Sequence, residues 1–124
     1  MRPLQDKPRT AFDEDPYLRD IVERNLEIAA QCCIDISHRI ISLENARKPT
    51  GYYDAILSMG ELDVLSPDFA RHLAPLAGFR NVLVHEYASV DWDQVYQHLQ
   101  RLADLERFAE RIRDWVRRRT EDAR

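Results

Sequence analysis

Apolar residues recur at helical spacing along most of this chain. The clearest run spans about three heptads in alternating four- and three-residue steps, and its members are Val22, Leu26, Ala29, Cys33, Ile36, Ile40 and Leu43. This spacing predicts a long amphipathic helix packed against a partner. Ile21, Ile28 and Cys32 are expected to widen the apolar seam on one flank.

The ends of this long helix carry local signals. Asp15-Pro16 is typical of a helix start, with a carboxylate at the cap and proline in the first turn. We expect the helix to end near Ala46, before the breaker 48–51. The preceding residues 1–14 are polar and contain Pro3 and Pro8, so we expect a loose N-terminal arm.

Three further helical stretches follow. The pattern predicts a short helix from Tyr53 to Leu65, weakened by Gly60. A second stretch, 67–87, begins at Ser66-Pro67 and should be kinked or split at Pro75. The last helix is expected to start at a capping box, 91–94, and to run to about residue 119 with an apolar face of Val95, Leu99, Leu102, Leu105, Ala109, Ile112 and Val116.

These elements predict an all-α fold, an up-and-down bundle of four to five helices in one domain, residues 15–124. The length of 124 residues, with 44% hydrophobic and 32% charged residues, fits one globular domain. No stretch reaches the roughly 20 apolar residues of a membrane-spanning helix, and residues 1–16 do not resemble a signal peptide.

Charge and cysteine content narrow the function classes. The net charge of −4 argues against a protein that coats nucleic acid by bulk charge. The adjacent Cys32 and Cys33 cannot staple distant segments, so we expect a reducing, cytoplasmic environment and treat both as small core residues. The four histidines are scattered singly, which predicts no metal site, and no glycine-rich phosphate loop is present.

One window differs from the rest of this acidic chain. Between Asp68 and Glu86 the sequence has no acidic residue but contains Arg71, His72, Arg80 and His85. We expect a local positive strip suited to a phosphodiester. On a regular helix Arg80 and Tyr87 share a face, as do Asn81 and His85, whereas Arg80 and His85 lie roughly 140° apart. Either the helix distorts or ends near His85, or two copies of the strip meet across a dimer axis.

These residue types permit RNA cleavage without a metal. RNA carries its own nucleophile, the 2′-hydroxyl, and a histidine can move protons near neutral pH. Arg80 can grip phosphate oxygens, Asn81 can orient the phosphate or the imidazole, and Tyr87 offers a hydroxyl for hydrogen bonding or covalent modification. The residues alone leave a plain alternative open, in which the histidine caps a helix and Arg80 and Tyr87 stack.

Arg80, His85 and Tyr87 match the R-x4-H-x-Y motif of the HepT-like ribonuclease toxins, within the HEPN superfamily. The resemblance extends to the strings 24–36, 49–52 and 79–91, and it covers nearly the whole chain from about Tyr17 onward. It implies a helical bundle that dimerises, with catalytic Arg80 and His85 in the cleft between protomers and Asn81 as a polar helper.

The resemblance also implies partners. They are an RNA substrate and a nucleotidyltransferase antitoxin of the MntA type, which transfers AMP from ATP onto the motif tyrosine, here Tyr87. No cofactor is implied. A different class stays open: a non-catalytic subunit of a two-component nucleotidyltransferase, in which the motif binds a nucleotide without cutting anything.

Five further residues have two interpretations each. Asp35 is expected to pair with Arg39 on the first long helix or, less simply, to face the cleft and orient a motif side chain. Arg117 and Arg118 fit a solvated helix end, or an RNA contact together with Arg71. Trp92 and Trp115 are interpreted as core or interface aromatics.

Overall fold

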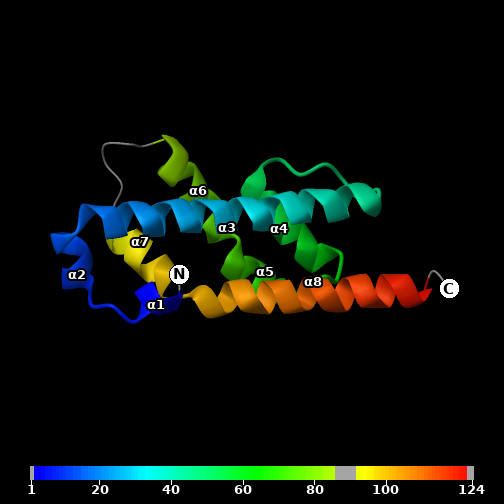
Figure 1. The fold of residues 1–124 in the computed structure, drawn as a ribbon. Helices are drawn as coiled ribbons and strands as arrows, with labels where there is room; N and C mark the ends of the chain where they lie inside the picture. The colour runs from blue at the N-terminus through cyan, green and yellow to red at the C-terminus, as the bar shows by residue number, and fades with distance from the viewer. Residues whose placement is uncertain (1, 86–91, 123–124) are drawn as a thin grey trace.

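The computed structural model describes residues 2–85 and 92–122; of residues 2, 81–85, 92, 94 and 122 it describes the backbone alone. Within these residues the structure consists of helices and contains no strand (Figure 1). The all-α prediction is therefore confirmed. The helices are α1 (Arg2–Gln5), α2 (Arg9–Glu14), α3 (Pro16–Leu43), α4 (Tyr52–Glu61), α5 (Pro67–Leu73), α6 (Pro75–His85), α7 (Trp92–Leu99) and α8 (Leu102–Asp122).

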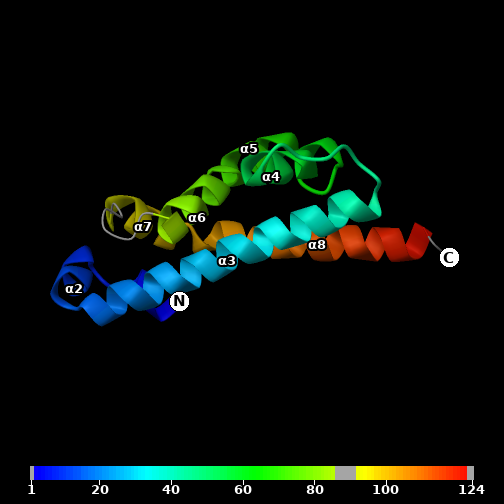
Figure 2. The same ribbon diagram turned by 90° about the horizontal axis from the view of Figure 1, so that it is seen from above.

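Two long helices, α3 and α8, run along the molecule in the same direction (Figures 1 and 2). The pair α5–α6 runs back in the opposite direction, and α4 packs against α3, α5 and α6. The core lies mainly where α3, α4, α5 and α6 meet. None of the helices in the described part of the chain is long and apolar enough to span a membrane.

Helix α3 starts as predicted but buries a different set of residues along its second half. The Asp15 side chain accepts a hydrogen bond from the Tyr17 amide at 3.0 Å. Ile36 and Leu43 are 36% and 42% exposed, because a straight helix of 3.6 residues per turn drifts away from a strict seven-residue repeat. The buried positions are Val22, Leu26, Ala30, Cys33, Ile34, Ser37, Ile40 and Ile41.

The predicted flank of this seam is also wrong. Ile21 and Ile28 are 46% and 51% exposed, and Cys32 is exposed. Cys33 is buried as expected, and burial raises the pKa of its thiol to about 12. The two adjacent cysteines therefore differ in burial, since neighbouring residues on a helix point about 100° apart.

The loop after α3 is fixed to α4 by a charged contact. Helix α3 ends at Leu43, earlier than expected, and Asn45 has a positive φ of 50°. Arg47 donates two hydrogen bonds to the Asp54 carboxylate, at 2.7 and 3.0 Å. The Thr50 amide donates to the same carboxylate at 2.9 Å, so the loop closes onto the first turn of α4.

Gly60 lies at the close approach of α4 and α5. A Cβ on Gly60 would stand 3.1 Å from both the Ala70 Cβ and the Pro67 Cα. Gly60, which was expected to weaken its helix, therefore permits the close contact between α4 and α5. Helix α4 ends at Glu61, short of the predicted Leu65.

The next junctions agree with the sequence. Ser66 caps α5 by accepting a hydrogen bond from the Phe69 amide at 3.2 Å, and Pro75 separates α5 from α6. The start of the predicted capping box at Asp91 lies outside the described residues. Trp115 packs against the core as expected, whereas nothing is described of the Trp92 side chain.

Residues 2–14 are not the loose arm that the sequence predicted. They contain α1 and α2, and Phe12 is fully buried with its ring 6.0 Å from that of Tyr96. Gln5 and Gln100 exchange side-chain-to-carbonyl hydrogen bonds at 3.2 and 3.0 Å. This contact lies at the break between α7 and α8, so the last predicted helix is two helices.

The apolar face of α8 differs in part from the predicted one. It includes Phe108, which is buried, whereas Val116 is 49% exposed.

Candidate functional site

The motif arginine lies where three helices meet. Arg80, on α6, is half-buried, and its guanidinium carbon stands 5.5 Å from the centre of the Tyr52 ring. Tyr52 is the first residue of α4. The ring of His38, from α3, meets Tyr52 edge-on at 5.9 Å with an interplanar angle of 82°. We call these residues the Arg80–Tyr52–His38 cluster.

Apolar side chains fix α6 and so determine the direction of Arg80. Leu76, Ala77 and Phe79 are buried at 6%, 0% and 5% exposure. The Phe79 ring stacks on His98 of α7 with centroids 4.2 Å apart. Burial, and secondarily the charge of Arg101, lowers the pKa of His98 below its usual value. Helix α6 is therefore held on one side by α3 and α4 and on the other by α7.

The remaining motif residues are described only in part. Asn81 and His85 lie on α6, which is helical through His85, while their side chains and all of Tyr87 lie outside the described residues. Five residues along a regular helix still place Arg80 and His85 roughly 140° apart. Their convergence in one protomer or across a dimer axis stays a prediction, as does the contribution of Asn81.

Two of the four residues of the positive strip predicted from the window 68–86 are paired with carboxylates. Arg71 pairs with Asp68 on α5 itself. His72 pairs through Nε2 with the Asp104 carboxylate of α8 at 2.7 Å, and its ring stacks on Phe69. Counting acidic residues along the sequence misses Asp104, because the tertiary fold brings it in from a distant helix.

Asp35 has a different partner from the one predicted. Its carboxylate is exposed and accepts a hydrogen bond from Gln31 Nε2 at 2.8 Å. In the described part of the chain no ion pair joins Asp35 to Arg39, so that prediction is wrong. Whether Asp35 orients a motif side chain stays a prediction.

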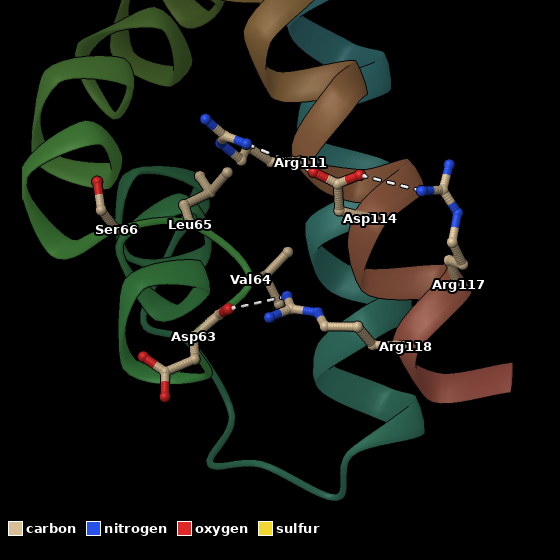
Figure 3. Close-up of a pocket in the computed structure, with 8 residues that line it drawn as sticks. All are labelled: Asp63, Val64, Leu65, Ser66, Arg111, Asp114, Arg117 and Arg118. Carbon is tan, nitrogen blue, oxygen red and sulfur yellow. Dashed lines mark hydrogen bonds and ion pairs between the residues drawn. The ribbon is translucent and has the colours of Figure 1, made fainter. Parts of the chain in front are cut away.

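A second feature is a hollow of about 580 Å³ between α8 and the loop 63–66 (Figure 3). Arg111 and Arg118 point across it towards the loop, and Arg118 donates to the Asp63 carbonyl at 3.5 Å. Arg117 lies on the far side of Asp114, whose carboxylate is 3.4 Å from Arg111 and 3.9 Å from Arg117. The sequence analysis missed Arg111, although Arg111 lies seven residues before Arg118 and therefore on the same face of α8.

Among the described residues no metal-binding cluster is found, because nowhere do three histidine, cysteine or carboxylate side chains gather. The Arg80–Tyr52–His38 cluster holds one guanidinium and two aromatic rings, and α6 carries His85 five residues beyond Arg80. A guanidinium can bind an anion, and that His85 joins it to move a proton stays a prediction.

Comparison with known proteins decides the family. The family model described as "Ribonuclease HepT-like" matches residues 2–112. This chain belongs to that family. A curated relative, the tRNA nuclease HepT of Aphanizomenon flos-aquae, is 38% identical over 76 residues, which are 61% of this chain. The match spans 52% of that relative, about half of its length.

A second curated relative of the family is the mRNA nuclease HepT of Shewanella oneidensis. It is 28% identical over 103 residues, covering 82% of this chain and 77% of the relative. The two relatives therefore bear names for different RNA classes.

Solved structures agree with the assignment to this family. A tri-AMPylated HEPN toxin of Shewanella oneidensis, in complex with an MNT antitoxin, matches with a TM-score of 0.75 and 28% identity. That match covers 83% of this chain and 78% of the toxin. A toxin–antitoxin structure with AMP-PNP matches with a TM-score of 0.81 at 24% identity, over 91% and 86% of the two chains, and shows likeness of fold alone.

Proposed function

We propose that this chain is a metal-independent RNA endonuclease and the toxin of a toxin–antitoxin pair. The observation that carries the proposal is the position of Arg80: a motif guanidinium held at the α3–α4–α6 junction, on the same helix as His85. Membership of the ribonuclease HepT-like family, with relatives named tRNA nuclease and mRNA nuclease, supports the reaction class.

The proposed reaction uses the 2′-hydroxyl of RNA as nucleophile. Its oxygen attacks the adjacent phosphorus, the bond to the 5′-oxygen breaks, and the products are a 2′,3′-cyclic phosphate and a 5′-hydroxyl. His85 moves a proton, either from the nucleophile or to the leaving oxygen. Arg80 stabilises the negative charge that grows on the phosphate, and Asn81 orients the phosphate or the imidazole.

A homodimer supplies the second proton-transfer group. One histidine cannot act as base and acid at the same moment, whereas a two-fold axis at the motif brings two arginines and two histidines to one cleft. The angle of roughly 140° between Arg80 and His85 on one helix supports this arrangement.

The proposed partner is an MntA-type nucleotidyltransferase antitoxin. The Tyr87 oxygen attacks the α-phosphorus of ATP, pyrophosphate leaves, and AMP stays on the tyrosine. Added phosphate beside Arg80 and His85 then occupies the anion site and excludes RNA. The similar Shewanella toxin, described as tri-AMPylated in complex with an MNT antitoxin, supports this regulation.

Contacts to the RNA backbone complete the proposal. Arg111, Arg117 and Arg118 line the hollow beside α8. All three guanidinium groups are exposed, and Asp114 neutralises only part of their charge. Arg71 on α5 is also exposed, but Asp68 compensates its charge, so an RNA contact of Arg71 requires this ion pair to open.

Substitution of the motif tests the proposal. We expect Arg80→Ala and His85→Ala each to lower RNA cleavage by about 100-fold or more, because each removes charge stabilisation or proton transfer. The assay measures cleavage of total transfer RNA and of a messenger by the purified chain. Arg113→Ala, an exposed arginine of α8, is the matched control.

The outcomes separate the candidate classes. Circular dichroism and thermal unfolding must show that both motif variants keep the fold. Equal cleavage by the parent and both variants would reject the catalytic assignment. A wild-type protein that binds its antitoxin but cuts no RNA would favour the non-catalytic subunit.

A further inference from the structure

We propose that Tyr52 is a positioning residue for Arg80, and that its ring face holds the guanidinium in the orientation needed to meet an RNA phosphate. The proposal rests on the RNA-cleaving function proposed above. Neither the motif nor the family comparison assigns a role to Tyr52, which lies on a different helix from Arg80.

The contact has the geometry of a cation–π pair. The Arg80 guanidinium carbon is 5.5 Å from the centre of the Tyr52 ring, inside the range of about 6 Å over which such pairs attract. A ring that covers one face of the guanidinium does not block its hydrogen-bond donors, because these point outwards in the plane of the group. An arginine held over a ring can therefore keep its orientation and still donate to phosphate oxygens.

The Tyr52 ring is itself held in place. It begins α4, directly after the loop that Arg47 and Thr50 bind to the Asp54 carboxylate. The ring of His38 also packs against it in a T-shaped arrangement. Two separate contacts, one on the backbone and one on the ring, thus fix the surface on which Arg80 rests.

His38 contributes by shape. Its Nε2 is buried, and within the described residues no hydrogen-bond partner reaches that atom. The imidazole is therefore kept in place by packing against Tyr52 and not by a polar contact of Nε2. A histidine used in this way supports the ring and takes no proton-transfer role in the proposal.

The neighbouring Tyr53 gives a matched control. It follows Tyr52 on α4 and is 48% exposed, against 36% for Tyr52. Among the described residues it makes no ring or cation contact. Removing its aromatic side chain tests the effect of losing a surface tyrosine at the same helix start.

Kinetics of RNA cleavage test the proposal. We expect Tyr52→Leu, which keeps the bulk but removes the π face, to lower kcat by about 3- to 30-fold with a smaller change in KM. Tyr52→Phe should restore kcat to within about twofold, because the face and not the hydroxyl holds Arg80. Tyr53→Leu should behave as wild type. Unchanged kcat in Tyr52→Leu, or a Tyr52→Phe variant as impaired as Tyr52→Leu, would overturn the proposal.

A spectroscopic readout separates this proposal from the proposed function. The ring current of Tyr52 should shift the side-chain Nε–H resonance of Arg80 in the wild type and in Tyr52→Phe, and the shift should vanish in Tyr52→Leu. If the wild type cuts no RNA but the shift behaves in this way, the endonuclease function fails and the positioning contact holds. If the resonance is the same in all three proteins, the positioning contact is wrong whatever the activity.

Discussion

At the scale of single residues, the arginines of this protein differ in what their guanidinium groups touch. Arg47 binds the Asp54 carboxylate, and these hydrogen bonds hold the pKa of Asp54 well below its usual range. Arg71 pairs with Asp68, whereas Arg80 rests on an aromatic ring. The sequence window without acidic residues included Arg71 and Arg80 alike. Only the motif spacing distinguishes the two, because Arg80 stands five residues before a histidine and Arg71 does not.

Residue chemistry also predicts where regulation acts. With the proposed nucleotidyltransferase partner and ATP, intact-mass measurement should show increments of AMP on the wild type. Tyr87→Phe should show none, because it lacks the phenolic oxygen that attacks the α-phosphorus. Tyr53→Phe serves as the control for labelling of other tyrosines. Equal labelling of wild type and Tyr87→Phe would remove Tyr87 as the acceptor.

At the scale of elements, helix starts were predictable and one helix break was not. The caps at Asp15 and Ser66 act on amides two or three residues away, so the local sequence contains all the information. The break between α7 and α8 has no proline or glycine. Gln5 bonds to Gln100 there from the other end of the chain, and only the tertiary fold brings the two together.

The contact between α6 and α7 should depend on pH. Burial lowers the pKa of His98 below its usual value of 6.5, so the folded protein binds fewer protons at this site than the unfolded chain. The stability that neutral His98 provides is therefore present above about pH 6.5 and is lost as pH falls through the folded-state pKa.

Chemical denaturation at pH 8 and pH 5 measures this effect. We expect the free energy of unfolding of the wild type to fall more on acidification than that of His98→Phe, which keeps a ring against Phe79 but cannot take a proton. Equal losses in the two proteins would show that His98 does not carry the dependence.

At the scale of the whole molecule, the fold joins residues from distant parts of the chain around α6. The sequence alone predicted that Arg80 and His85 lie on one helical stretch, and the family resemblance implied that both are catalytic. It could not identify Tyr52 or His38, because a tyrosine at a helix start and a lone histidine resemble ordinary packing residues until α3 and α4 are placed beside α6.

The N-terminal segment makes the same point. Its polar composition and two prolines suggested a loose arm, yet Phe12 is fully buried between this segment and α7. Burial of this one phenylalanine favours an ordered segment despite its polar neighbours, because burying a side chain of that size contributes about 1.5–3 kcal/mol of stability.

The chemical nature of the RNA ends tests the central claim most directly. We expect the purified chain, treated with EDTA, to cleave RNA at the rate of the untreated protein and to leave 2′,3′-cyclic phosphate and 5′-hydroxyl ends. Mass spectrometry of the fragments identifies these ends, with Arg80→Ala as the inactive control. Cleavage that stops in EDTA, or fragments that end in a 3′-hydroxyl, would contradict attack by the 2′-hydroxyl under the control of Arg80 and His85.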